Sequence, residues 1–135
     1  MHAKVTWLHD QQYDAVSHSG HRIAMDGDAA HQGGASPMEM VLMALCGCTS
    51  VDVVSILRKK REPLTSLVVS AVAEQAAEAP RVFTHVQLTY HIGGGVSQKA
   101  ADDAVSLSKN KYCSVSKMLE KSATIDYVIT YGDPA

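Results

Sequence analysis

The chain has 135 residues, 46% of them hydrophobic and 19% charged, which excludes a disordered protein and leaves enough apolar residues for a core. The net charge of −2, from 12 basic and 14 acidic residues, gives no basic patch for nucleic acid or for an anionic membrane. The length suits one domain, and we expect residues 1–135 to form a single domain.

The first part of the chain alternates apolar and polar residues and then turns into a helix. The predicted strands of a meander are 3–9, 12–17 and 21–25, followed by a loop over 29–36. A helix is predicted from Pro37 to about Lys60, because Ser36 is a natural N-cap and Pro suits the first helical position. Pro63 prevents its continuation.

The second part mixes strands and helices without strict alternation. The predicted elements are strands at 67–74 and 82–92, helices at 97–109 and 114–121, and a strand at 125–131. One face of the 82–92 strand carries Val82, Val86, Leu88, Tyr90 and Ile92. The other face carries Phe83, His85, Gln87, Thr89 and His91. This order predicts an α+β fold with a largely antiparallel sheet and no second domain.

The long helix is apolar on nearly every side between residues 40 and 57, so something must cover all of it. A membrane span is rejected because Asp52 would lie in the middle of the bilayer. A stripe of mostly small residues would permit close helix packing: Ala44, Gly47, Cys48 and Val51. We therefore predict a homodimer. The alternative is that the second and third helices of the same chain cover this face.

Three cysteines are the wrong number for a secreted disulfide framework, and the N-terminus has no apolar leader segment. We therefore expect a cytoplasmic protein. Cys46 and Cys48 would lie about 200° apart around a helix, so they cannot pair with each other or share one metal. Each is either a reactive thiol or a small buried hydrophobic residue.

Three further residues can be interpreted in two ways. Cys113 precedes a predicted helix and lies near lysines, which favours the thiolate and lowers the thiol pKa, unless it only caps the helix. Asp52 lies one turn past Cys48 and either pairs with a neighbouring group or acts in catalysis. Glu39 either complements the helix dipole or lies at the mouth of a site.

The seven histidines show no convincing metal-binding pattern. His18 and His21 are three apart without a helix to align them, and His85 and His91 are too far apart on one strand to chelate together. The glycines at 93–95 lack the spacing and the lysine of a phosphate loop. We expect no metal and no cofactor.

Two motifs make the chain similar to a known family. Residues 34–54, with Pro37 opening an apolar helix and Cys48 three turns later, resemble the long helix of the OsmC/Ohr superfamily. Residues 111–117, around Cys113, resemble its second cysteine motif, Cys-Pro-Val-Ser. The element order also matches, so the resemblance covers nearly the whole chain, and it is closest to the YhfA-like subgroup.

This resemblance implies an intertwined α+β homodimer with antiparallel sheets around long buried central helices. It also implies a thiol-dependent peroxidase of the oxidative stress response that reduces organic hydroperoxides and, in some members, hydrogen peroxide. On this pattern Cys48 attacks a small hydrophobic peroxide, Cys113 resolves the sulfenic acid as a disulfide, and a dithiol reduces that disulfide. Cys46 is then an extra, structural thiol.

The sequence departs from the family pattern at three places. The peroxidases have Glu directly after the helix-opening Pro, where this chain has Met38, with Glu39 one position later. They also use an arginine from the N-terminal strands, where this chain has only Arg22, and Ser114 replaces the Pro of the second motif. Glu39 is therefore included with Cys48 and Cys113 as a candidate catalytic residue.

Two other functions stay open. The first is a non-catalytic stress or small-ligand-binding protein on the same fold. The second is hydrolysis or group transfer through a cysteine nucleophile, which would need a histidine base near Cys48 that the sequence does not place there.

Overall fold

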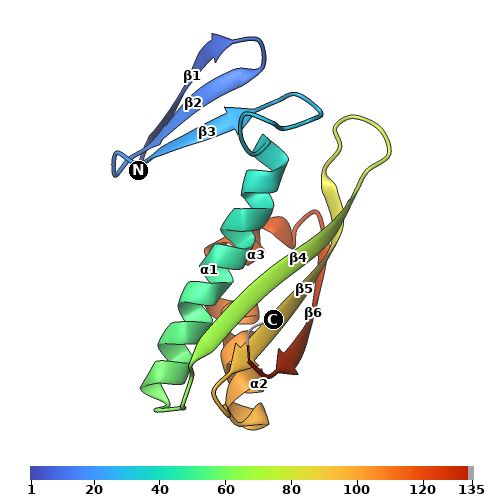
Figure 1. The fold of residues 1–135 in the computed structure, drawn as a ribbon. Helices are drawn as coiled ribbons and strands as arrows, with labels where there is room; N and C mark the ends of the chain where they lie inside the picture. The colour runs from blue at the N-terminus through green and yellow to red at the C-terminus, as the bar shows by residue number, and fades with distance from the viewer. Residues whose placement is uncertain (134–135) are drawn as a thin grey trace. The chain divides into compact units, whose positions relative to one another are not determined.

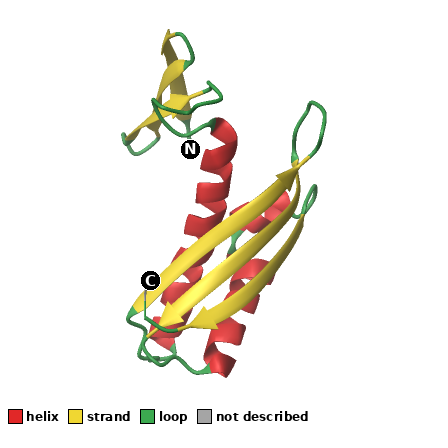
Figure 2. Cartoon of the chain, turned by 45° about the vertical axis from the view of Figure 1, so that its right-hand side comes forward, coloured by secondary structure: helices red, strands yellow, loops and turns green. Residues whose placement is uncertain are grey.

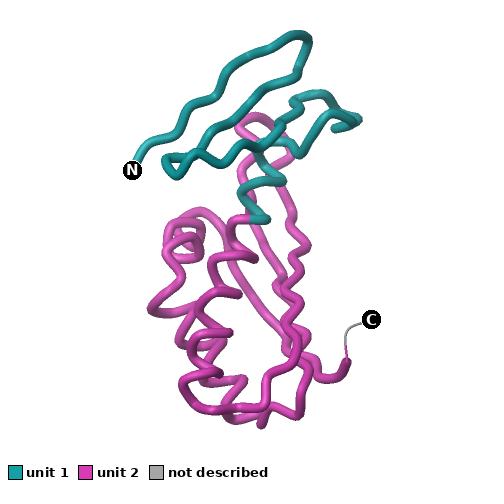
Figure 3. Tube along the Cα trace, turned by 60° about the vertical axis from the view of Figure 1, so that its left-hand side comes forward, with its two compact units in different colours: residues 1–43 teal, residues 44–135 magenta. Residues whose placement is uncertain are grey.

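The computed structural model describes residues 1–133, which form the helices and strands of Figure 1. The chain divides into two compact units, residues 1–43 and 44–135 (Figure 3). The strands are β1 (Ala3–His9), β2 (Gln12–Ser17), β3 (Arg22–Asp26), β4 (Ser66–Gln75), β5 (Phe83–Gly93) and β6 (Thr124–Tyr131). The helices are α1 (Pro37–Lys59), α2 (Gln98–Leu107), the π-helical turn η1 (Ser108–Tyr112) and α3 (Ser114–Leu119). The expectation of a single domain over 1–135 stays a prediction.

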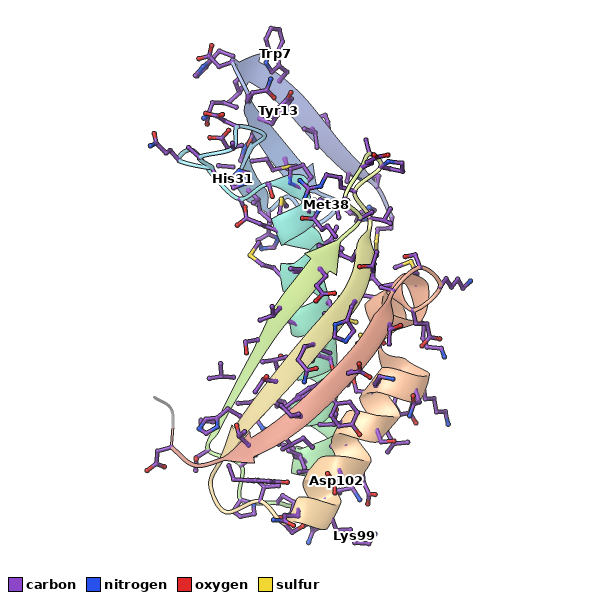
Figure 4. The ribbon with its side chains drawn as sticks, turned by 90° about the vertical axis from the view of Figure 1, so that its right-hand side faces the viewer. Trp7, Tyr13, His31, Met38, Lys99 and Asp102 are labelled. Atoms are coloured by element: carbon purple, nitrogen blue, oxygen red, sulfur yellow. The ribbon has the colours of Figure 1, made fainter. Side chains whose placement is uncertain are left out.

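The first unit is an antiparallel meander in the order β1-β2-β3, as the sequence predicts. Trp7 lies directly opposite Tyr13 on the β1–β2 pair (Figure 4). The loop after β3 folds around the Asp26 carboxylate, which accepts hydrogen bonds from the Asp28 and Gly33 backbone N–H groups at 2.8 and 2.9 Å. These bonds, that of Asp28 first, lower the pKa of Asp26. In residues 1–43 no apolar side chain is buried.

The second unit is a three-stranded sheet, β4-β5-β6, with its helices on one face (Figure 2). The predicted alternation along β5 is confirmed at Val86, Leu88, Tyr90 and Ile92, which are all at most 1% exposed. These side chains form the core together with Leu45, Val53 and Leu57 of α1 and Ala101, Ala104 and Val105 of α2.

The start of β5 differs from the prediction. The pairing with β4 passes from Glu74–His85 to Gln75–Phe83, so Thr84 is an extra residue in a bulge. The extra residue of the bulge shifts the alternation of side chains by one, so the residue before it points to the opposite face of the sheet. Phe83 is therefore buried, and Val82 lies outside the strand and is 43% exposed, so the faces predicted for these two residues are wrong.

The last strand, β6, pairs with β5 in parallel, while the other three strand pairs are antiparallel. The predicted α+β fold with largely antiparallel sheets is therefore confirmed, with one parallel pair. A parallel pair needs a crossover, which α2, η1 and α3 supply. The predicted helix over 97–109 begins after the N-cap Ser97 and ends at Leu107, where the chain continues as η1.

In the second unit, α1 buries one side and exposes the other. Leu45, Thr49, Val53 and Leu57 are buried, whereas Gly47 is exposed and Val51 is 71% exposed. Helices α2 and α3 of the same chain therefore leave this side open among the described residues, contrary to the alternative considered above. By length and composition α1 could also span a membrane, with a mean hydropathy of 2.1 and 22% of that stretch buried, but core helices meet the same criteria. Both the homodimer and the absence of a span stay predictions.

Candidate functional site

Cys48 and Cys113 approach each other from different elements of the second unit. Cys48 is half-buried on α1. Cys113 is fully buried at the N-cap of α3, where its sulfur accepts a hydrogen bond from the Ser116 N–H at 3.4 Å. Both thiols are free, and Cys48 lies near enough to affect the ionisation of Cys113. The structure thus brings together the two cysteines that the sequence singles out.

The ionisation of Cys113 runs opposite to the prediction from its place at a helix end. Burial raises the pKa of the Cys113 thiol, the Ser116 N–H lowers it by less, and Cys48 raises it further. Desolvation disfavours the thiolate, and here it outweighs the positive end of a short helix. The predicted lowering is therefore wrong, and Cys113 rests as a neutral thiol.

Cys46 is half-buried on α1, two residues before Cys48. Burial raises the pKa of the Cys46 thiol, so it too favours the neutral form. At about 200° from Cys48 around the helix, it lies on another face. These properties fit the structural role that the resemblance implies.

A chain of buried hydroxyl groups lies beside the two cysteines and is absent from the sequence-based predictions. Thr49 Oγ1 lies 2.7 Å from the Tyr90 hydroxyl and 2.7 Å from Ser108 Oγ. Burial raises the pKa of Tyr90 to about 12, and the nearby Cys113 and Cys46 thiols add to that rise. This chain of hydroxyl groups joins α1, β5 and η1, and the residues that carry them are at most 1% exposed.

Asp52 sets the direction of every bond in this chain. Ser108 Oγ donates to Asp52 Oδ2 at 2.8 Å, and a hydroxyl group has only one hydrogen to donate. Ser108 has then used its one hydrogen, so Thr49 donates to Ser108, and Tyr90 in turn donates to Thr49. Of the two interpretations of Asp52, the pairing with a neighbouring group is the one observed.

Asp52 also lines a groove of about 480 Å³ in the second unit. The other lining residues are Ser55, Ile56, Lys59, Lys60, Leu107 and Tyr112. Asp52 is one helical turn from Cys48, and Tyr112 directly precedes Cys113, but neither cysteine is among the residues that line the groove. It combines apolar side chains with groups of both charges.

Glu39 lies in the first unit and forms a capping box with Ser36. The Ser36 N–H donates to Glu39 Oε1 at 2.8 Å, and the Glu39 N–H donates to Ser36 Oγ at 3.2 Å. The first of these bonds is the main cause of a lowered pKa for Glu39. His31 Nε2 lies 3.8 Å from Glu39 Oε1. In the same unit, Arg22 pairs with Asp14 at 3.0 Å.

The histidines have ordinary partners. His85 Nε2 lies 2.8 Å from Asp126 Oδ2, and His91 Nδ1 lies 2.7 Å from Thr130 Oγ1. His18 lies against the ring of His2, at 4.2 Å between centroids. In the described part of the chain, no three His, Cys, Asp or Glu side chains gather in a group that could hold a metal ion.

Comparisons with known proteins bear on this site. The OsmC-like protein family matches residues 28–128. Protein YhfA of Escherichia coli is 44% identical over 128 residues, which cover 94% of this chain and 95% of that protein. A solved structure of a hypothetical protein from Aquifex aeolicus is 25% identical, with a TM-score of 0.85 over 98% of this chain and 97% of that one.

An organic hydroperoxide resistance protein OsmC from Legionella pneumophila has a TM-score of 0.72 at 14% identity, covering 95% of this chain and 94% of that one. This likeness shows the fold alone.

Proposed function

The chain belongs to the OsmC-like family, and we propose that it is a thiol-dependent peroxidase that reduces organic hydroperoxides, and hydrogen peroxide as a second substrate, in the defence against oxidative stress. The observation that carries this proposal is the approach of the half-buried Cys48 to the buried Cys113. A thiol that can be oxidised, placed beside a second thiol, is the minimum that a two-cysteine peroxidase requires.

The proposed reaction has three steps. The Cys48 thiolate attacks the distal peroxide oxygen, the O–O bond breaks, and the released alkoxide takes a proton to become the alcohol. Cys48 is then a sulfenic acid. The Cys113 sulfur attacks the Cys48 sulfur, the S–O bond breaks, and hydroxide leaves as water with the proton that Cys113 loses. A dithiol reductant returns both cysteines to thiols by disulfide exchange.

The groove beside Asp52 supports a small hydrophobic substrate. Ile56, Leu107 and the Tyr112 ring give it an apolar wall next to the elements that carry both cysteines. Apolar walls with a few polar groups are typical of small-molecule sites. The alternative, a non-catalytic protein that holds a small ligand, would use the same groove, and the experiment below separates the two.

Glu39 is proposed as a catalytic residue on the family pattern alone. Its capping box uses one carboxylate oxygen for the Ser36 N–H. The variant Glu39→Gln keeps an oxygen for that bond and removes the charge. A lower rate of peroxide consumption with unchanged helix content would support the catalytic role, and an unchanged rate would leave Glu39 as a capping residue only.

We also propose that the working unit is a homodimer in the cytoplasm. The three strands of the first unit bury no apolar side chain, although an isolated small sheet needs a packed face to be stable. Val51 and Gly47 on α1 are open as well. A second copy of this chain would cover both surfaces, and three free cysteines suit a reducing compartment.

The test is mass spectrometry after one equivalent of cumene hydroperoxide, with Cys48→Ser as the inactive variant and Cys46→Ser as the matched control. We expect a Cys48–Cys113 disulfide in the wild type and in Cys46→Ser, and no fast peroxide consumption by Cys48→Ser. Slow and equal consumption by all three, with no such disulfide, would overturn the enzymatic proposal in favour of ligand binding.

A further inference from the structure

We propose that Ser108 is a positioning residue that sets Cys113 against Cys48. It is held for this purpose by Thr49 and Asp52, and it ties the turn that carries one cysteine to the helix that carries the other. The inference rests on the proposed function only in its use of the Cys48–Cys113 disulfide. The thiol pair itself can be measured without any peroxide.

Helix α1 holds Ser108 from one side. Thr49 directly follows Cys48, and Asp52 lies one turn further along α1. Both reach the hydroxyl of Ser108, at 2.7 Å from Thr49 Oγ1 and 2.8 Å from Asp52 Oδ2. The stretch of α1 around Cys48 therefore holds Ser108 at two points.

The turn η1 links Ser108 to Cys113 through the backbone. The Cys113 N–H donates to the Ser108 carbonyl oxygen at 2.8 Å and so closes η1. On the far side of Cys113, Ser116 Oγ shares its one hydrogen between the Lys109 and Cys113 carbonyl oxygens, at 3.2 and 3.1 Å. The backbone of Cys113 is thus fixed to Ser108 and Ser116.

Ser108 is held firmly in its place. Its hydroxyl is fully buried, and it donates to Asp52 while it accepts from Thr49. If Ser108 moved away, a carboxylate would lose a donor and a buried hydroxyl would lose its acceptor, which costs more than the bonds themselves contribute. The hydroxyl chain is therefore a clamp with one preferred position.

The clamp matters for disulfide formation because a disulfide forms only over a narrow range of distances and orientations of its two cysteines. Its Cα atoms must come within about 7 Å, with the Cβ atoms facing each other. Holding two reacting groups in such a geometry raises their effective concentration. We expect Ser108 to raise the effective concentration of the Cys113 thiol at Cys48, and not to touch the peroxide.

The test equilibrates the full chain with reduced and oxidised glutathione, followed by acid quenching, alkylation and quantification of the Cys48–Cys113 disulfide by peptide mass. All proteins carry Cys46→Ser, so that Cys46 cannot compete. The variants are Ser108→Ala and Thr49→Val, with Ser108→Thr as the conservative rescue. The matched control is Ser106→Ala, whose hydroxyl accepts a hydrogen bond from the Asn110 side-chain amide at 3.3 Å.

We expect Ser108→Ala and Thr49→Val each to lower the equilibrium constant for the disulfide about tenfold, the size of one lost positioning hydrogen bond. Ser108→Thr and Ser106→Ala should stay within about twofold of the parent. A merely structural serine would destabilise the reduced and oxidised proteins alike and leave this constant unchanged, which would overturn the proposal. Using two variants keeps the test valid if either of them fails to fold.

The outcome also separates this inference from the proposed function. A parent protein that forms the disulfide in glutathione but does not consume peroxide would refute the peroxidase and leave the positioning role standing. A parent protein that forms no Cys48–Cys113 disulfide at all would refute the positioning role.

Discussion

The substitution Thr49→Val removes one buried hydroxyl from the middle of the hydrogen-bonded chain and leaves the side-chain volume nearly unchanged. The Tyr90 O–H then loses its acceptor, and the Ser108 oxygen loses its donor. The stranded Tyr90 donor costs about 1–3 kcal/mol and the Ser108 oxygen, which keeps its bond to Asp52, about 1 kcal/mol, so we expect a loss of about 2–4 kcal/mol in the free energy of unfolding. Little of this loss comes from a cavity, because Val fills the same space.

The second arm of the experiment is Tyr90→Phe, which removes the first donor of the chain. Thr49 still donates to Ser108 and loses only a donor to its oxygen, so the expected cost is about 1 kcal/mol. In the double variant Thr49→Val, Tyr90→Phe, no phenol is left stranded. The double variant also has no Thr49 oxygen left without a donor, so it should lose about 2–4 kcal/mol less than the sum of the two single variants.

Urea unfolding, followed by far-ultraviolet circular dichroism at one protein concentration, measures all four proteins. The reasoning fails if Thr49→Val lies within about 0.5 kcal/mol of the wild type, the range of an ordinary surface substitution. It also fails if the two substitutions are strictly additive, because hydroxyls joined in one buried chain must be coupled.

Three further predictions concern ionisation. The pKa of Tyr90 is about 12 in the folded protein and 10 in its reference state. Its contribution to stability is therefore fully present below pH 10 and is lost as the pH rises toward 12, a loss of about 3 kcal/mol. Alkaline titration of Tyr90→Phe should not show this loss. The raised pKa of Cys113 predicts that iodoacetamide alkylates this thiol, in the Cys48→Ser variant, only at a higher pH than it alkylates an ordinary cysteine. If the rate of alkylation rises at the same pH for Cys113 and for a model thiol, the prediction is contradicted. The lowered pKa of Glu39 predicts that its capping box stabilises α1 above the usual carboxyl pKa and that this stabilisation is lost as the pH falls below it. In an acid titration, Glu39→Ala should therefore have less helix than the wild type at pH 7 and the same helix content at pH 2.

Local signals account for the elements that the sequence predicts well. Helix α1 begins at Pro37 after the cap at Ser36, and it ends before Pro63, as capping and proline chemistry require. The alternation along β5 identifies the buried face from Val86 onward. Each of these signals depends on residues that are close together in the sequence.

The hydroxyl chain could not be predicted in the same way. Thr49 meets Tyr90 across 41 residues and Ser108 across 59, and nothing in the neighbourhood of these residues marks them as partners. Thr49 looks like an ordinary polar residue that interrupts an apolar helix. Only the packing of α1 against β5 and η1 brings the three hydroxyls together.

The candidate site was predicted in part for a similar reason. The family resemblance singles out Cys48 and Cys113, and the structure places them near each other. The ionisation of Cys113 was predicted in the wrong direction because the sequence displays the nearby lysines and the helix end but not the burial of the sulfur. The bulge at Thr84 is a further feature of pairing geometry that alternation alone does not reveal.

The parallel pairing of β6 with β5 also affects how the chain is made. Paired residues of the two strands, such as His91 and Thr130, are 39 residues apart, with α2, η1 and α3 between them (Figure 1). At about 5–20 residues per second, a ribosome needs about 2–8 s to add that stretch. For that interval one edge of the central strand presents unpaired N–H and C=O groups, which other unfinished chains can join. While this stretch is being made, the protein therefore depends on a low local concentration of its own nascent copies.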